Sequence, residues 1–480
     1  MFSYVSVYFI FFLMIFLTVY CLMPGARTRQ AVILLGNIVF YMLASGSMQL
    51  LIVFASSIIV YLAGRAIEKT YEGFEEEAQG LKRMQQAALL ASYKKRARRV
   101  IVPAIALILI ILIYGKVGNL LSWTQAGNFS DLLHFRTYIL PLGISYYTFS
   151  SIGYLVDLYK RKAKCEHNYI LVLICMTYFP HIVEGPISRY DGLFAQFRNL
   201  PGFSYRRVCF GMQRAVWGYF KKLVLADRIA LFTSTIYSAP AEYSGAEIIV
   251  AAVLGAVQMY ADFSGCMDIV IGISEAVGVR LEENFNCPFF AKTAAEFWQR
   301  WHITLCKWFR EYLFYPIATG PLAQKLGKKC RKFAGPRLGS LIPSYVSMVV
   351  VWFMTGLWHG TGLDYIAWGV YWGIIIMLGT AFADLFKKLE AALRINTESF
   401  AYETWQIIRT FLLFCLGRML TVTGSLTGFF ILIRQLFRGG KFWIFFDGTI
   451  YNYGLDRNNF TVVLRSEEHT SELQSLAYLV

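Results

Sequence analysis

The segment that decides the fold is the first apolar run, Phe2–Met23, which reads FSYVSVYFIFFLMIFLTVYCLM and contains no charged residue. It is long enough to cross a bilayer as one helix. It lacks the basic start and the small-residue cleavage site of a secretory signal peptide. Pro24 and Gly25 follow and are expected to end the helix. The run therefore predicts a spanning helix that stays in the protein.

Similar apolar stretches recur along the rest of the chain and predict further spans. They cover residues 31–44, 48–63, 100–114, 138–158, 169–183, 212–225, 248–276, 344–358, 365–382, 407–420 and 428–436. Judged by length, they form about ten to twelve spanning or half-spanning helices. We therefore expect an all-α, polytopic transmembrane bundle.

Composition supports a membrane protein and excludes several other classes. Of 480 residues, 57% are hydrophobic and 16% are charged, against about 25% charged in an ordinary soluble domain. These values exclude a disordered chain and an ordinary cytosolic enzyme. The net charge is +16 (46 − 30), but the basic residues lie in short runs between apolar segments, as in cytoplasmic loops. We therefore expect a lipid bilayer and no nucleic acid as a partner.

The distribution of basic residues predicts the orientation. The first loop carries Arg27 and Arg29, the second, residues 45–47, carries no charge, and the segment from Arg65 to Arg99 is strongly basic. Basic residues accumulate in cytoplasmic loops. We therefore expect the N-terminus outside and a cytoplasmic loop from Arg65 to Arg99.

Two segments depart from the pattern of spans. Residues 281–343 mix apolar, basic and aromatic residues, which predicts interfacial or re-entrant helices. Residues 465–480 match a translated sequencing adapter, so we expect them to be non-native and the span that begins at Thr461 to be cut short. The expected organisation is 1–136 for the N-terminal spans and basic loop, 137–464 for a core bundle, and 465–480 for the tail.

Ionisable residues within apolar segments are the candidate functional residues, because they are costly in a membrane. His181 is close to Glu184 and could pair with it or line a funnel. In a continuous helix, His302 would share one face with Trp298, Trp301 and Leu305. His359 ends an apolar span, where Gly356 and Gly360 would allow another backbone to approach closely. For each histidine, a packing role stays open beside a functional one.

Metal and nucleotide sites are not indicated. The nine cysteines form no Cys-x-x-Cys pair, and a site built on His302 and His359 lacks an obvious third ligand. Phosphate-binding, dinucleotide and serine-hydrolase motifs are absent. We therefore expect no bound metal and no bound cofactor.

Several motifs in fixed order resemble the membrane-bound O-acyltransferase family, and most closely its bacterial branch of alginate acetylation and teichoic acid D-alanylation. The matching stretches are LPLGISYYTF (140–149), YFP (178–180), EGPI (184–187), YADFSG (260–265), Glu282 with NFN (284–286), EFWQRWHI (296–303) and GLWHG (356–360). No internal repeat is evident, whereas a transporter built from inverted halves would be expected to show one.

The resemblance implies transfer of an acyl group, along a central tunnel, from a thioester donor (acyl-CoA or acyl-carrier protein) to a hydroxyl. The family's Trp-His-Gly histidine falls on His359, the expected general base, which burial would keep neutral. Its Arg-Trp-His histidine falls on His302, expected to orient a substrate or stabilise an oxyanion. A covalent acyl-histidine route stays open. Residues expected to line the tunnel or support it are Asp262, Glu296, Arg300, Trp358, Trp301 and Glu184; for the first three, a structural ion pair is an equal alternative.

The implied setting is the bacterial cytoplasmic membrane. We expect a polysaccharide or teichoic acid acceptor outside, a donor carrier on the cytoplasmic side and an extracellular esterase-like or transferase partner. Acetyl is the favoured cargo, with D-alanyl transfer and a non-catalytic transporter as alternatives.

Overall fold

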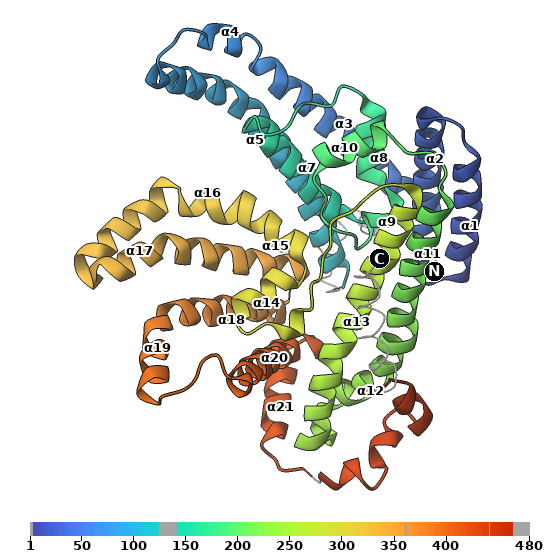
Figure 1. Ribbon diagram of the computed structural model, residues 1–480, viewed down its shortest axis with the longest axis vertical. Coiled ribbons are helices and arrows are strands. Elements are labelled where there is room, and N and C mark those ends of the chain that lie inside the picture. Colours follow the sequence, from blue (N-terminus) through green and yellow to red (C-terminus); the bar gives the residue numbers. More distant parts are fainter. Residues whose placement is uncertain (1–2, 124–141, 361, 441, 464–480) are drawn as a thin grey trace. The chain divides into compact units, whose positions relative to one another are not determined.

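The computed structural model describes residues 3–123, 142–360, 362–440 and 442–463 (Figure 1). In these ranges the chain is helical without a regular strand, and Phe285 and Trp301 form one isolated β-bridge. The expected all-α class is confirmed. The adapter-like tail, the first residues of the span expected at 138–158 and the motif residues 140–141 lie outside the described ranges.

The chain forms two compact units. The first comprises Met1–Ala215 and Ile269–Glu282, and the second comprises Val216–Asp268 and the residues from Glu283 onward. Two helices, α11 (Tyr205–Tyr219) and α13 (Gly245–Val277), contribute residues to both. The division into domains expected at residue 136 stays a prediction.

In the first unit, the helices follow the predicted apolar runs. They are α1 (Val7–Leu22), α2 (Ala26–Ala44), α3 (Ser47–Thr70), α4 (Phe74–Ala78), α5 (Arg83–Trp123), α7 (Ile144–Tyr159), α8 (Tyr169–Thr177), α9 (Phe179–Ile182), α10 (Tyr190–Arg198) and most of α11 (Tyr205–Tyr219). The hydroxyl of Ser6 caps α1 by accepting a hydrogen bond from the amide of Phe9. Beyond Leu22 the chain turns, as the Pro-Gly pair predicts.

Two details of this unit differ from expectation. The segment 65–99, expected as a loop, is mostly helical, because α3 runs on to Thr70 and α5 begins at Arg83. Its residues include many alanines, glutamines, lysines and arginines, which favour helix even when exposed. The run 169–183 is broken at Tyr178, between α8 and α9, because in a continuous helix Pro180 would lack the amide hydrogen to donate and its ring would clash with the carbonyl of Met176.

The second unit contains the remaining α- and π-helices, besides its part of α11 and α13. They are a π-helix, η1 (Phe220–Ala226), then α12 (Asp227–Ser238), α14 (Ala294–Arg300), α15 (Ile303–Phe309), a second π-helix η4 (Arg310–Phe314), α16 (Tyr315–Ala318), α17 (Pro321–His359), α18 (Leu363–Ala381), α19 (Ala383–Ala392), α20 (Phe400–Val422) and α21 (Leu426–Leu436). In the region where interfacial or re-entrant segments were expected, residues 294–318 form short helices, whereas the residues from Pro321 onward belong to the long helix α17. The helix α17 contains two prolines, Pro336 and Pro343. It is kinked just before the first of them, at Gly335, whose φ is +88°.

Six helices among the described residues are long and apolar enough to cross a bilayer, and α1 and α21 are shorter apolar helices. Large apolar side chains are exposed along them, for example Phe11 and Leu51. Such surfaces are stable in lipid rather than in water. The chain is therefore a multi-pass membrane protein.

Close glycine contacts hold α11 against α13. A Cβ on Gly272 would lie 2.3 Å from the carbonyl oxygen of Gly211, and a Cβ on Gly211 would lie 2.4 Å from that of Gly272. In the second unit, a Cβ on Gly265 would lie 2.8 Å from the carbonyl oxygen of Gly218. The helices therefore approach to backbone contact at these points, as small residues permit in membrane helix pairs.

Candidate active site

His302 lies at a break between two short helices. α14 ends at Arg300, Trp301 is extended, and α15 begins at Ile303. His302 itself has φ +47° and ψ +53°, a left-handed conformation that is uncommon for residues other than glycine. The expectation that Trp298, Trp301, His302 and Leu305 share one face of a continuous helix is therefore wrong.

The break arises from pairing with a distant segment. The amide of Asn286 donates to the carbonyl of Arg300 at 2.9 Å, and the amide of Ile303 donates to the carbonyl of Asn284 at 3.0 Å. These bonds replace helical ones around Trp301, which forms the β-bridge to Phe285. A local helical pattern cannot reveal a long-range pairing of this kind.

Aromatic rings surround this break. Trp301 is 3% exposed, and its ring centroid lies 5.0 Å from that of Phe285 and 5.1 Å from that of Phe414. The ring of Phe263 lies edge-on to His302 at 4.9 Å. Such rings contribute large buried areas, so they hold the backbone of the break in place. Trp301 therefore acts here as a packing residue.

The imidazole of His302 is buried and anchored through one nitrogen. The residue is 2% exposed, and its Nδ1 lies 3.2 Å from Oδ1 of Asn284. His302 lies outside the six spanning helices. Burial, and secondarily the nearby His359, lowers the pKa of His302 to about 3, because a charged imidazolium is poorly solvated there. The ring is therefore neutral at physiological pH.

His359 is the last residue of α17, and its side chain is exposed. The expectation that it is deeply buried is therefore wrong: the helix ends at this residue, so one side of the ring stays uncovered. Its ring centroid lies 4.5 Å from that of Trp358 and 4.9 Å from that of Trp368. The exposed ring is consequently accessible to a small molecule.

Trp358 brings the two histidines together. Its ring lies 5.9 Å from that of His302 and 4.5 Å from that of His359, centroid to centroid. The close approach expected at the glycines is confirmed, because a Cβ on Gly356 would lie 2.5 Å from the carbonyl oxygen of Tyr365. One imidazole is thus buried and one is accessible, and both lie close to the same indole.

Asp262 is part of a network of charges on α13 and η1. Its carboxylate lies 2.9 Å from Nζ of Lys222, which also lies 2.7 Å from a carboxylate oxygen of Asp227. The neighbouring Lys221 pairs with Asp268 and donates to the hydroxyl of Ser264 at 3.0 Å. These contacts favour the structural alternative for Asp262.

Glu296 and Arg300 form an ion pair at 2.6 Å across one turn of α14, and both side chains are about one-third exposed. Glu296 also accepts a hydrogen bond from the amide of Lys292 at 2.8 Å, while Thr293 accepts one from the amide of Glu296. Thr293 is thus the N-cap of α14, and Glu296 additionally holds the residue before the cap. The contacts again favour a structural role.

Glu184 lies in the first unit, in the turn after α9, and is half-buried. The neighbouring His181 is buried, and its Nδ1 donates to the carbonyl oxygen of Tyr178 at 3.1 Å. A place for Glu184 along a tunnel stays a prediction.

Arg418, within the spanning helix α20, was missed by the sequence analysis. Its Nε is buried and has no hydrogen-bond partner in the described part of the chain, while one terminal nitrogen donates to Thr421 at 3.0 Å. Asp262 and Tyr365 are among the groups that act on it electrostatically. An arginine inside the apolar stretch 410–422 is the signal that could have pointed to it, because such residues are functional candidates by default.

One group of possible metal ligands occurs among the described residues. Ligand atoms of Glu68, Cys165 and His167 all lie within 4.8 Å of one another. Glu68 already pairs with Arg65 at 3.5 Å and with His167 at 2.9 Å. Burial raises the pKa of the Cys165 thiol to about 11. A cation there would have to displace both Arg65 and the thiol proton.

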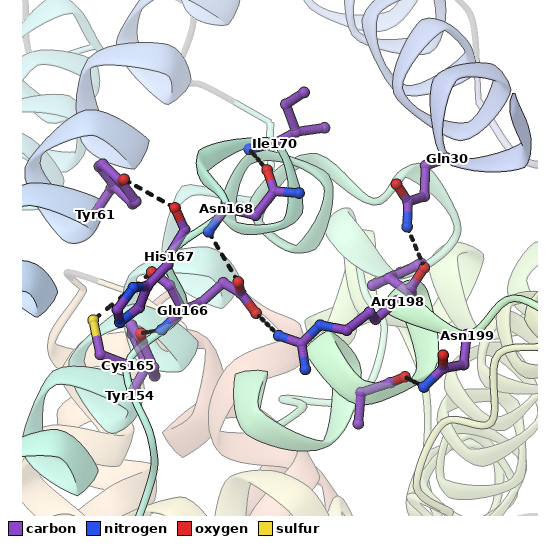
Figure 2. A network of polar contacts seen from close by, with 12 residues as sticks. Gln30, Tyr61, Tyr154, Cys165, Glu166, His167, Asn168, Ile170, Arg198 and Asn199 are labelled. Atoms are coloured by element: carbon purple, nitrogen blue, oxygen red, sulfur yellow. Dashed lines mark hydrogen bonds and ion pairs between the residues drawn. The ribbon is translucent and has the colours of Figure 1, made fainter. Parts of the chain in front are cut away.

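These contacts instead anchor the loop that connects α7 to α8. Figure 2 shows Glu166 accepting hydrogen bonds from the side chain of Arg198 and from the amide of Asn168. Tyr61 donates to the carbonyl of His167 at 3.0 Å in the same view. The loop is therefore held by side chains from two helices of the first unit, α3 and α10.

Comparison of the sequence with known proteins relates the chain to acyltransferases. No protein-family model matches it. The chain is 28% identical over 416 residues to the "Probable alginate O-acetylase AlgI" of Pseudomonas aeruginosa, which covers 86% of this chain and 70% of that protein. It is 30% identical over 283 residues to the peptidoglycan O-acetyltransferase of Helicobacter pylori, covering 53% and 50%. It is 27% identical over 292 residues to the teichoic acid D-alanyltransferase of Streptococcus thermophilus, covering 59% and 64%. The chain is therefore an acyltransferase, similar to bacterial O-acetyltransferases and D-alanyltransferases, in agreement with the resemblance of its motifs to the membrane-bound O-acyltransferase family.

Proposed function

We propose that this protein transfers an acyl group, acetyl in our assignment, from a cytoplasmic thioester donor to hydroxyls of an extracellular polysaccharide. The observation that carries the proposal is the pair of imidazoles around Trp358, one accessible and one buried. The names of the relatives from Pseudomonas and Helicobacter support acetyl as the cargo and a polysaccharide or cell-wall polymer as the acceptor.

In this proposal, His359 acts as the general base. An alcohol is a poor nucleophile at neutral pH, so a base within hydrogen-bond reach must take its proton as it attacks. The hydroxyl oxygen forms a bond to the thioester carbonyl carbon, and the proton passes to His359. The carbon–sulfur bond then breaks, and His359 returns the proton to the leaving thiolate. The products are an ester and a free thiol, and the imidazole ends neutral.

The setting follows from the membrane topology that the basic loops predict. The donor, acyl-CoA or an acyl-carrier protein, approaches from the cytoplasm, and the acceptor lies outside the bacterial cytoplasmic membrane. No bound cofactor takes part in the proposed reaction. A donor carrier inside and an esterase-like or transferase protein outside are the proposed partners, and a central tunnel connects the two faces.

The test is replacement of His359 by alanine in membranes supplied with labelled acetyl thioester and polysaccharide. We expect ester formation to fall by at least 100-fold, the lower range for general base catalysis. The matched control is His167→Ala, because His167 is an exposed histidine in the first unit. Unchanged ester formation by His359→Ala at normal protein levels would overturn the proposal.

The relative from Streptococcus thermophilus favours a second candidate, D-alanyl transfer to teichoic acid. The same membranes supplied with a D-alanyl carrier thioester distinguish the two, since only the correct donor yields an ester. The transporter alternative has its own outcome, in which label crosses the bilayer without forming an ester.

A further inference from the structure

We propose that Asn284 is a positioning residue that fixes His302 with its proton on Nδ1, so that Nε2 accepts a hydrogen bond from a hydroxyl of the acceptor substrate. The identity of that substrate rests on the proposed function, whereas the tautomer does not. The proposal decides between the two roles expected for His302, because an oxyanion would need a donor at this position.

The orientation of the Asn284 side chain follows from its neighbours. The backbone amide of Thr304 lies 3.1 Å from Oδ1 of Asn284, and the hydroxyl of Thr304 lies 2.9 Å from the same atom. A backbone amide can only donate, so the atom that faces it must be the amide oxygen. The amide nitrogen then points to the sulfur of Met267 at 3.2 Å. The usual ambiguity between oxygen and nitrogen of an asparagine is therefore resolved.

The same oxygen determines the tautomer of His302. Nδ1 of His302 lies 3.2 Å from Oδ1 of Asn284, and an oxygen of this kind can only accept. Nδ1 therefore carries the proton. A neutral imidazole has one N–H, so the other nitrogen, Nε2, keeps a lone pair.

Nε2 is the part of His302 that remains for a ligand. It is buried and has no hydrogen-bond partner in the ranges that the structure describes, and the residue is 2% exposed. A buried polar atom without a partner is costly, and in a functional site it marks a position that a substrate group fills. With a lone pair and no proton, Nε2 can receive an O–H but cannot donate to an oxyanion.

Backbone hydrogen bonds keep Asn284 in place independently of its side chain. Its carbonyl accepts from the amide of Ile303, and the amide of Asn286 donates to the carbonyl of Arg300. His302, between these two bonds, adopts its left-handed conformation. Substitution of the Asn284 side chain should therefore change the state of the imidazole more than the fold.

The first test reads the tautomer directly and needs no enzyme activity. The full-length protein in nanodiscs is labelled with ¹⁵N-histidine, and the His302 signals are identified by their loss in His302→Gln. We expect a proton on Nδ1 and none on Nε2 in the wild type, and a mixture of tautomers in Asn284→Ala. Asn286→Ala is the matched control, because Asn286 is exposed in the same segment. A proton on Nε2 of the wild type would overturn the proposal.

The second test uses Asn284→Asp and measures acyl transfer against pH. A carboxylate beside Nδ1 favours the imidazolium, which carries a proton on both nitrogens. If Nε2 is an acceptor, KM for the polysaccharide rises as the pH is lowered from about 8 to 5, by about tenfold, the value of one hydrogen bond at its upper range. If His302 instead served as an oxyanion donor, kcat of Asn284→Asp relative to kcat of the wild type at the same pH would rise over this change of pH, and the proposal would be wrong; the ratio removes the protonation of His359, which both proteins share.

Thr304 provides a graded control. Thr304→Val removes the hydroxyl donor but keeps the amide that orients Oδ1, so we expect KM to rise about threefold, and Thr304→Ser should match the wild type. Failure of the proposed function would appear as a wild type without acyl transfer but with the expected tautomer. Failure of the present inference would appear as an active wild type with the other tautomer.

Discussion

The pair of Lys221 and Asp268 allows a quantitative test of the charge network described above. Lys221 is 6% exposed and Asp268 is 15% exposed, and Lys221 also donates to the hydroxyl of Ser264. We consider the substitution Lys221→Met, which keeps the length of the side chain and removes its charge. Asp268, on the spanning helix α13, then loses this cation.

The magnitude follows from the cost of a buried charge without its partner. Removal of one member of a buried pair destabilises proteins by about 3–5 kcal/mol. At an unfolding entropy of about 2.1 cal/mol/K per residue, the midpoint of a chain of 480 residues shifts by about 1 °C per kcal/mol, so the thermal midpoint should fall by about 3–5 °C. The double variant Lys221→Met with Asp268→Asn removes both charges, so it should recover most of this loss.

Thermal unfolding of the detergent-solubilised protein, followed by fluorescence-detected size exclusion at one fixed heating schedule, measures the shift. The exposed pair of Arg337 and Asp384 gives the control, because exposed pairs contribute only about 0–1 kcal/mol. A midpoint that Lys221→Met leaves within about 1 °C, or a double variant as unstable as the single one, would refute the reasoning.

Further predictions concern packing, pH and the membrane arginine. Gly272→Ala should lower the thermal midpoint, because the added Cβ would lie 2.3 Å from a backbone oxygen, whereas Gly379→Ala, with no atom within 4 Å, should raise it slightly. The pKa of His302 lies near 3 when folded and near 6.5 when unfolded. The unfolded chain therefore binds more protons between these values, and stability falls as the pH drops. From pH 7 to 5 the loss is about 2 kcal/mol, and comparison of denaturation curves should show it missing in His302→Gln. Arg418→Met should keep the thermal midpoint but reduce acyl transfer at least tenfold; retained transfer would show that the arginine is only structural.

The spans could be predicted from the sequence because a helix that crosses the membrane needs an apolar run about as long as the hydrocarbon core is thick. The run 248–276 became α13 and the run 407–420 became the core of α20. Helix ends were less predictable. The extension of α20 to Phe400 adds polar residues that no hydropathy pattern includes.

The site was predictable in its residue types but not in its geometry. The motifs pointed to His302 and His359, yet the break at His302 depends on pairing with residues 284–286, which lie far away in the sequence. The exposure of His359 depends on where α17 ends. Arg418 was missed because the apolar residues around it dominate any average over the segment.

The π-helix η1 makes the length of its segment as important as its composition. A π-helix contains more residues per turn than an α-helix, and this spacing lets the adjacent Lys221 and Lys222 both reach acidic residues of α13. Loss of one residue there would rotate the following helix by about 100° and separate the lysines from Asp262 and Asp268. Homologous chains should therefore align through residues 220–226 without a gap, even where the identities of the side chains differ.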